Sequence, residues 1–115
     1  MKRVYVAGAY SSNNVITVFD NMRKGMRLST EVMLAGYAPF CPWLDYHFQL
    51  QLREGEALSV NDYYQYSLTW LEVSDAVLLV PGWEHSKGTI EEIKVAKSLN
   101  IPVYYTLVKL KKELI

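Results

Sequence analysis

Short apolar runs alternate along this chain with longer stretches in which apolar residues recur every three or four positions. The short runs have the length of buried strands, and the longer stretches have the spacing of amphipathic helices. The predicted strands are residues 4–7, 37–41, 76–80 and 103–107, and the predicted helices are residues 15–35, 60–73 and 89–99. The pattern therefore predicts a chain in which strands and helices alternate.

Alternating strands and helices are typical of a parallel sheet joined by right-handed crossovers. We expect a single α/β domain over residues 1–115, a flavodoxin-like or Rossmann-like three-layer sandwich. Its sheet would have four to five parallel strands in the order 2-1-3-4(-5). The chain then reverses direction between strands 1 and 3, and ligands of such sheets bind outside the carboxyl ends of the strands at that point.

Several residues predict where the helices begin, end and face. Gly36 is expected to end the first helix, and Ser59 to cap the helix from Val60 with Asp62 at the capping-box position. Residues 43–58 are predicted to be a loop with a short helix that covers a site, and 108–115 a short helix or extension. The apolar positions of the first helix are Val15, Val18, Phe19, Met22, Met26 and Met33.

Two loops of small and polar residues follow strands 1 and 3, at the predicted binding edge of the sheet. They are residues 8–14 and residues 81–88. The second loop leads directly into a helix, whose exposed N–H groups favour an anion such as a phosphate. The sequence therefore predicts a ligand site between these two loops.

Two glutamates follow the second loop, and we expect both in the first turn of its helix. On a wheel of ~100° per residue, Ile93, Ala96 and Leu99 define the inward face, and Glu92 lies within about 40° of its centre. Glu91 falls on the solvent side. Glu92 is thus either a nucleophile or acid–base group in the cleft, or a carboxylate held by the helix dipole or a lysine.

Composition narrows the classes of function. Twelve basic residues balance twelve acidic ones, which argues against a nucleic-acid polymer as partner. No apolar run approaches the ~20 residues of a membrane span, no signal peptide precedes the first strand, and Cys41 is alone, so we expect a cytoplasmic protein. Neither His47 nor His85 has ligands at metal-binding spacing, and no metal is predicted.

Five segments of the chain resemble nucleoside 2-deoxyribosyltransferase-like proteins, which include deoxynucleoside 5′-monophosphate N-glycosidases and short bacterial and phage proteins. These segments are residues 4–11, 74–83, 86–89, 92–96 and 102–103. The resemblance implies that Glu92 attacks C1′ of a nucleoside or nucleotide, expels the base and forms a glycosyl ester. Water or a second base then resolves the ester, and no cofactor takes part.

The resemblance also assigns roles around the sugar. The transferases carry an aspartate at the position of Ser86, which holds a 5′-hydroxyl, whereas the glycosidases carry a serine that binds a 5′-phosphate. Ser86, Lys87 and Gly88 would accept a phosphate, and we favour a nucleotide over a nucleoside. Gly8, Ser11 and Ser12 in the first loop add binding groups, although the arginine common there in glycosidases is absent.

Other candidates have structural alternatives that the sequence leaves open. Tyr10 either hydrogen-bonds the catalytic carboxylate, stacks on the base or packs at the rim, and Asp62 either orients the sugar or caps its helix. Trp43 and Trp83 either sandwich a nucleobase or cover the core. Asp45 is a candidate base-reading residue.

The resemblance also implies a homodimer or higher homo-oligomer with shared sites. Two other functions compete with glycosidic-bond chemistry. One is a non-catalytic nucleotide-binding or sensing module of the same fold. The other is a phosphoribohydrolase of the lysine-decarboxylase-like fold, whose Pro-Gly…Gly-Thr-x-x-Glu pattern is similar to residues 81–92.

Overall fold

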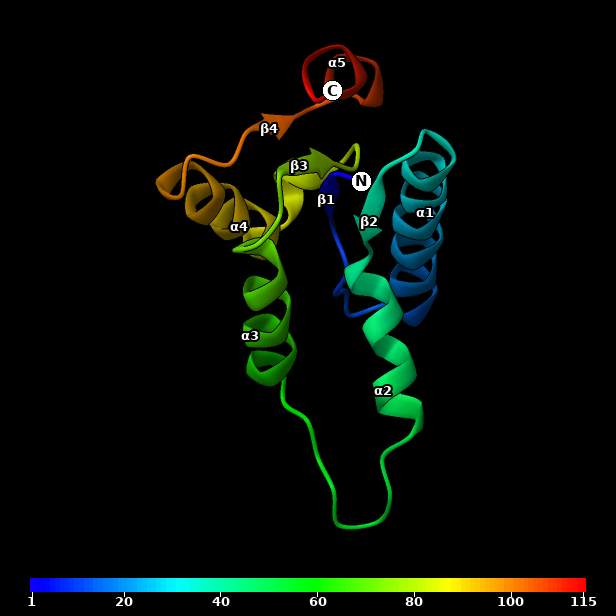
Figure 1. The fold of residues 1–115 in the computed structure, drawn as a ribbon. Coiled ribbons are helices and arrows are strands. Elements are labelled where there is room, and N and C mark those ends of the chain that lie inside the picture. Colours follow the sequence, from blue (N-terminus) through cyan, green and yellow to red (C-terminus); the bar gives the residue numbers. More distant parts are fainter.

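A four-stranded parallel sheet lies between two layers of helices in the computed structural model, which describes all 115 residues (Figure 1). The strands are β1 (Arg3–Ala7), β2 (Ala38–Phe40), β3 (Ala76–Leu79) and β4 (Val103–Tyr104). Their order is β2-β1-β3-β4, and all three neighbouring pairs are parallel. The predicted three-layer α/β fold and its strand order are confirmed.

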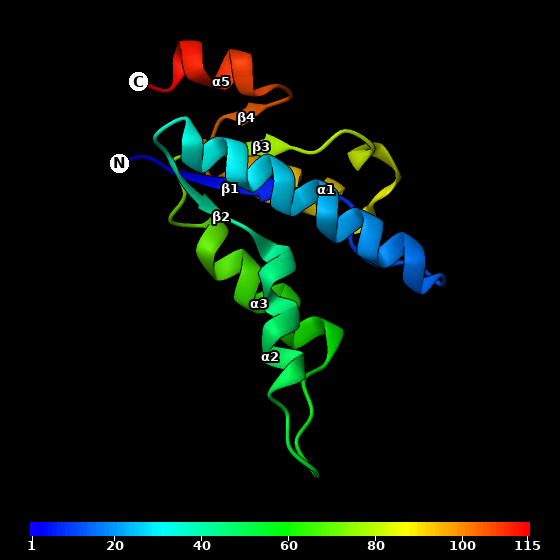
Figure 2. The same ribbon diagram turned by 90° about the vertical axis from the view of Figure 1, so that its right-hand side faces the viewer.

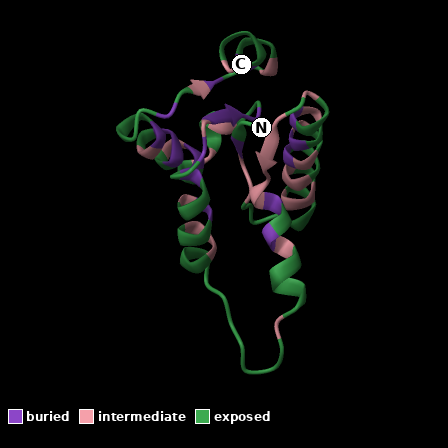
Figure 3. Ribbon diagram, viewed as in Figure 1, coloured by how far each residue is buried: buried purple, intermediate pink, exposed green.

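Alternate residues of the central strands pack against different helix layers. Val4 and Val6 of β1 belong to one buried cluster, which receives Val32 from α1 (Val15–Leu34) and Leu110 from α5 (Leu107–Glu113). Tyr5 and Ala7 belong to a second cluster, on the side of α3 (Val60–Leu71) and α4 (Lys87–Ser98). Figure 3 shows this burial concentrated in the strands and the inner helix faces. β1 is therefore buried on both faces, as its continuous apolar run predicts.

Only some of the apolar positions predicted for the first helix face the core. Met22 and Met26 pack against the core, but Val15 and Met33 are 59% and 64% exposed. The buried positions are Gly25, Ser29 and Val32. The indole of Trp43 lies directly against Gly25, where an added Cβ would come within 2.3 Å of the ring. Small residues thus let α1 approach a large aromatic side chain.

Side-chain caps explain the differences between predicted and observed helix boundaries. Ser86 Oγ accepts a hydrogen bond from the Thr89 N–H at 3.2 Å, so α4 begins at Lys87 rather than Thr89. The prediction that the two glutamates occupy its first turn is therefore wrong; they lie in the second turn. Leu99 is also 46% exposed rather than inward. Thr106 caps α5 in the same way, which ends β4 at Tyr104 and not at residue 107.

Residues 42–59 form an arm that extends away from the sheet (Figure 2). The arm contains the short 3-10 helix η1 (Pro42–Asp45) and α2 (Tyr46–Leu50), followed by an exposed loop that returns to α3. The Tyr63 hydroxyl donates a hydrogen bond to Gln49 Oε1 at 2.7 Å, which joins α3 to α2. The predicted loop with a short helix is confirmed, and it forms one wall of the cavity described next.

Candidate functional site

A cavity of about 500 Å³ opens at the carboxyl ends of β1 and β3, where the strand order reverses. Its walls come from the loop after β1, from η1 and α2, from α3 and from the start of α4. Nine of the twelve residues that the sequence singled out line it: Gly8, Tyr10, Ser11, Trp43, Asp45, Ser86, Lys87, Gly88 and Glu92. The two loops expected to face each other across the sheet edge therefore share one cavity.

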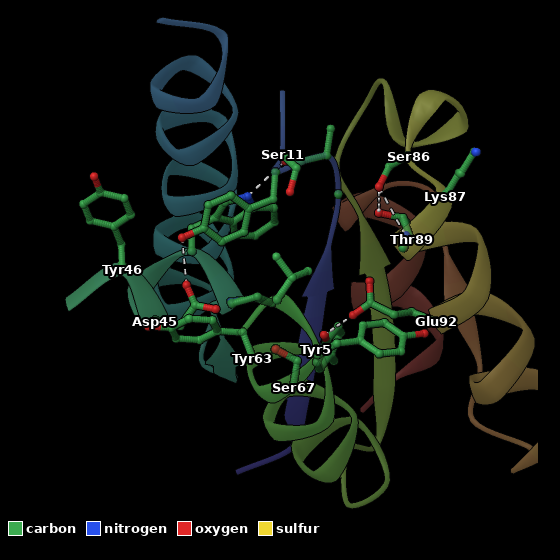
Figure 4. A pocket seen from close by; sticks show the side chains of 18 of the residues that line it. Tyr5, Ser11, Asp45, Tyr46, Tyr63, Ser67, Ser86, Lys87, Thr89 and Glu92 are labelled. Atoms are coloured by element: carbon green, nitrogen blue, oxygen red, sulfur yellow. Dashed lines mark hydrogen bonds between the residues drawn. The ribbon is translucent and has the colours of Figure 1, made fainter. Parts of the chain in front are cut away.

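Glu92 lies on the wall formed by α4 and is 8% exposed (Figure 4). Its Oε2 accepts a hydrogen bond from the Tyr5 hydroxyl, while Oε1 has no hydrogen-bond partner. Burial raises the pKa of Glu92 from 4.5 to about 7, and the hydrogen bond from Tyr5 opposes this increase. The sequence-based expectation that Glu92, rather than Glu91, points inward is confirmed. Glu91 is exposed and pairs with Lys94 at 3.2 Å.

Tyr5 is a functional candidate that the sequence pattern did not indicate, because a tyrosine within an apolar run also fits a buried strand. Its side chain is completely buried, and both burial and the neighbouring Glu92 raise the pKa of its hydroxyl. Tyr5 therefore remains a hydrogen-bond donor. A buried tyrosine hydroxyl needs a polar partner, so a tyrosine inside a buried strand next to the binding edge was a usable signal.

A second tyrosine–carboxylate pair lies on the opposite wall of the cavity (Figure 4). The Tyr10 hydroxyl donates to Asp45 Oδ1 at 2.7 Å, and Asp45 is 8% exposed. Of the alternatives left open for Tyr10, a hydrogen bond to the carboxylate of Glu92 is not found, because its hydroxyl contacts Asp45. Burial raises the pKa of Asp45, and the hydrogen bond from Tyr10 opposes that rise. Asn21 Nδ2 donates to the Tyr10 carbonyl and so steadies this loop.

The start of α4 gives the cavity a polar, positively polarised rim. Ser86 Oγ accepts from the Thr89 N–H and from the Thr89 hydroxyl, at 3.2 and 2.9 Å. The N–H groups of Lys87 and Gly88 belong to the first turn, where a helix offers them no carbonyl partner. A Cβ at Gly88 would meet no atom within 4 Å. The protein itself therefore does not require a glycine there, and the open space admits a ligand close to the backbone.

Three predicted residues lie outside this cavity. Asp62 forms the capping box with Ser59, and this role, the alternative to orienting a sugar, is confirmed. Ser12 Oγ accepts a hydrogen bond from the Asn14 N–H in the first loop. Trp83 packs against Tyr105, with ring centroids 5.8 Å apart.

Trp43 lines the cavity but is a core residue. It is 1% exposed, and its indole N–H donates to the Ala9 carbonyl at 3.0 Å. The proposed sandwich of a nucleobase between Trp43 and Trp83 is therefore wrong, because one ring is covered and the other lies outside the cavity.

No group of three or more His, Cys, Asp or Glu residues is arranged to hold a metal ion. No helix is long and apolar enough to cross a bilayer.

Comparison with protein families gives one match. The model of a family described as "Domain of unknown function (DUF4406)" matches residues 2–105, which include all four strands and the whole cavity. The chain belongs to this family. No curated protein matches it. The match ends before α5, so the family pattern covers the site and all of the sheet.

Proposed function

We propose that this protein cleaves or transfers the N-glycosidic bond of a (2′-deoxy)nucleoside 5′-monophosphate or nucleoside, with Glu92 as the nucleophile at C1′. The observation that carries the proposal is the state of the Glu92 carboxylate. One oxygen is held by a buried tyrosine, the other has no partner, and the group lines a cavity large enough for a small ligand. The resemblance to nucleoside 2-deoxyribosyltransferase-like proteins supports the same chemistry.

Two roles follow for the residues of this wall. Tyr5 donates to Oε2 and holds the carboxylate in one orientation, which leaves Oε1 to bond with C1′ as the bond from C1′ to the base breaks. Water or a second base then displaces the carboxylate from C1′. With a pKa of about 7, a large fraction of Glu92 is ionised at neutral pH, as a nucleophile requires.

The start of α4 is suited to the 5′ end of the same sugar. Ser86 precedes Glu92 by six positions, which corresponds to roughly 9 Å along a helix axis. A sugar bound with C1′ at Glu92 would extend its 5′ substituent toward this rim. The unpaired N–H groups there and the Lys87 side chain favour a phosphate over a hydroxyl. These features support a nucleotide substrate.

The direct experiment is incubation with each of the common deoxynucleoside 5′-monophosphates and nucleosides, followed by chromatography for free base. We expect base release from at least one nucleotide, its loss in Glu92→Gln, and its retention in Glu91→Gln, which removes an exposed carboxylate from the same helix. Exchange when a second base is added identifies a transferase. If no substrate releases base while Glu92→Ala still binds nucleotides as the wild type does, the protein is a nucleotide-binding module.

The resemblance also supports an assembly in which a neighbouring chain completes the site. Sedimentation velocity tests this part of the proposal. A dimer or larger species is expected, and a monomer at the concentrations of the activity assay would contradict it.

A further inference from the structure

The cavity contains a second buried carboxylate that the nucleophilic step does not use. Asp45 and Glu92 lie on opposite walls, and each has one oxygen held by a tyrosine hydroxyl (Figure 4). Asp45 Oδ2 has no hydrogen-bond partner, yet the protein contains no buried side-chain oxygen or nitrogen left unpaired. Oδ2 is therefore open to the cavity. Two carboxyl groups on either side of a scissile bond are the arrangement with which glycosidases combine a nucleophile and an acid.

The environments of the two groups differ in a way that suits different roles. Glu92 lies in the second turn of α4, a helix capped by Ser86 and begun by Lys87, on the side proposed for the sugar and its 5′ substituent. Asp45 lies in η1 and takes part in none of the four ion pairs of the protein. Its titratable neighbours include Tyr10, Cys41, Tyr63 and Tyr66, all of which are neutral at pH 7. The Lys87 and His85 side chains also line the cavity, but they come from the start of α4 and the turn before it. No positive charge among the four neighbours favours the ionised form of Asp45, so its proton is retained more readily than that of an exposed aspartate.

From this arrangement we infer that Asp45 is a catalytic residue, the general acid that protonates the departing base. This inference rests on the proposed function. As Glu92 Oε1 bonds to C1′, the electron pair of the bond between C1′ and the base moves to the base, and the proton of Asp45 passes to a nitrogen or oxygen of that base. Asp45 is left as a carboxylate that Tyr10 stabilises by its hydrogen bond. Water, or an incoming base, then attacks C1′, releases Glu92 as a carboxylate and returns one proton to Asp45.

A substrate whose base departs without a proton distinguishes a general acid at Asp45 from a residue with a structural role. A purine nucleotide methylated at N7 carries a positive charge on its base, and the base departs neutral without an acid. Asp45→Asn keeps the size of the side chain and an oxygen that accepts from Tyr10, but it has no acidic proton. We expect this variant to lose about 10²–10⁴-fold in kcat on an unmodified purine nucleotide, and less than tenfold on the methylated one. Asp20→Asn, which removes an exposed carboxylate from α1, should change neither rate.

Each other result overturns the inference in a recognisable way. Equal losses on both substrates mean that Asp45 only supports the shape of the cavity, and no loss on either means that it takes no part in catalysis.

The wild-type pH profile gives a test that needs no variant. The rate on an unmodified nucleotide should fall as the pH rises through the pKa of Asp45, which burial raises, and the rate on the methylated nucleotide should not. The same fall for both substrates contradicts the inference. Failure of the proposed function itself looks different, because the wild type then releases base from neither substrate above the uncatalysed rate.

Discussion

Replacing the buried Glu92 with glutamine should make the protein more stable at neutral and alkaline pH. The folded protein holds this carboxyl at a pKa of about 7, against 4.5 when it is exposed. A group whose pKa is raised by folding contributes its stability below the unfolded-state value and loses it as pH rises through the folded-state value. Ionised Glu92 therefore lowers the free energy of unfolding above pH 7. Glutamine carries no charge and can still accept the hydrogen bond from Tyr5.

The size of the effect follows from the two pKa values. One pKa unit corresponds to about 1.4 kcal/mol, so the raised pKa corresponds to about 3 kcal/mol when Glu92 is fully ionised. Between pH 5 and pH 8 the free energy of unfolding of the wild type should fall by about 2.5 kcal/mol relative to that of Glu92→Gln. This difference is large against the total stability of a small domain. Residues built into active sites often reduce stability in this way.

Urea unfolding at several pH values, followed by circular dichroism, measures this difference. Other groups also titrate between pH 5 and pH 8, but they are common to both proteins and cancel in the comparison. Glu91→Gln is the matched control, because it removes an exposed carboxylate next to Glu92 from the same helix. If the gap between Glu92→Gln and wild type stays constant from pH 5 to pH 8, Glu92 is not a desolvated carboxyl and the reasoning fails.

Three further predictions concern the cavity and its support. Tyr5→Phe removes the hydrogen bond that stabilises ionised Glu92, so the acid limb of the pH profile of kcat/KM should move to higher pH. An unchanged acid limb would show that Tyr5 does not act through Glu92. Ser86→Asp keeps a good helix cap but adds a negative charge at the rim. In a base-release assay kcat/KM should fall about 10–100-fold for 5′-monophosphates and stay unchanged for nucleosides. Equal effects on both substrates would show that the 5′ group does not bind at this rim. Gly25→Ala places a methyl group against the Trp43 ring and should lower the free energy of unfolding, measured in urea, by about 1–3 kcal/mol. In Gly55→Ala the added Cβ meets no atom but φ is +85°, so this variant measures the cost of backbone strain in the arm alone. If Gly25→Ala left the stability unchanged, α1 would be free to shift away from the ring.

Much of the fold was predictable because its signals are local. The strand β1 and the capping box of Ser59 and Asp62 each depend on residues close together in sequence. The choice of Glu92 over Glu91 needed only the period of one helix, and the strand order then placed that residue at the carboxyl edge of the sheet. The N-cap at Ser86 is equally local, but Ser86 follows a loop of small and polar residues, and the predicted helix begins at Thr89, two residues after the observed start of α4.

The sequence by itself therefore determined the alternation of strands and helices, the edge of the sheet at which the cavity opens and the glutamate that lines it. Tertiary structure alone decided which side chains meet there. Tyr5 reaches Glu92 across 87 positions of sequence, and Tyr10 reaches Asp45 across 35. From the sequence, Trp43 could either stack on a base or cover the core, and its packing against Gly25 shows that it is a core residue. Periodicity shows which face of an element is buried, but partners at such separations depend on strand register and on how closely the helices approach the sheet.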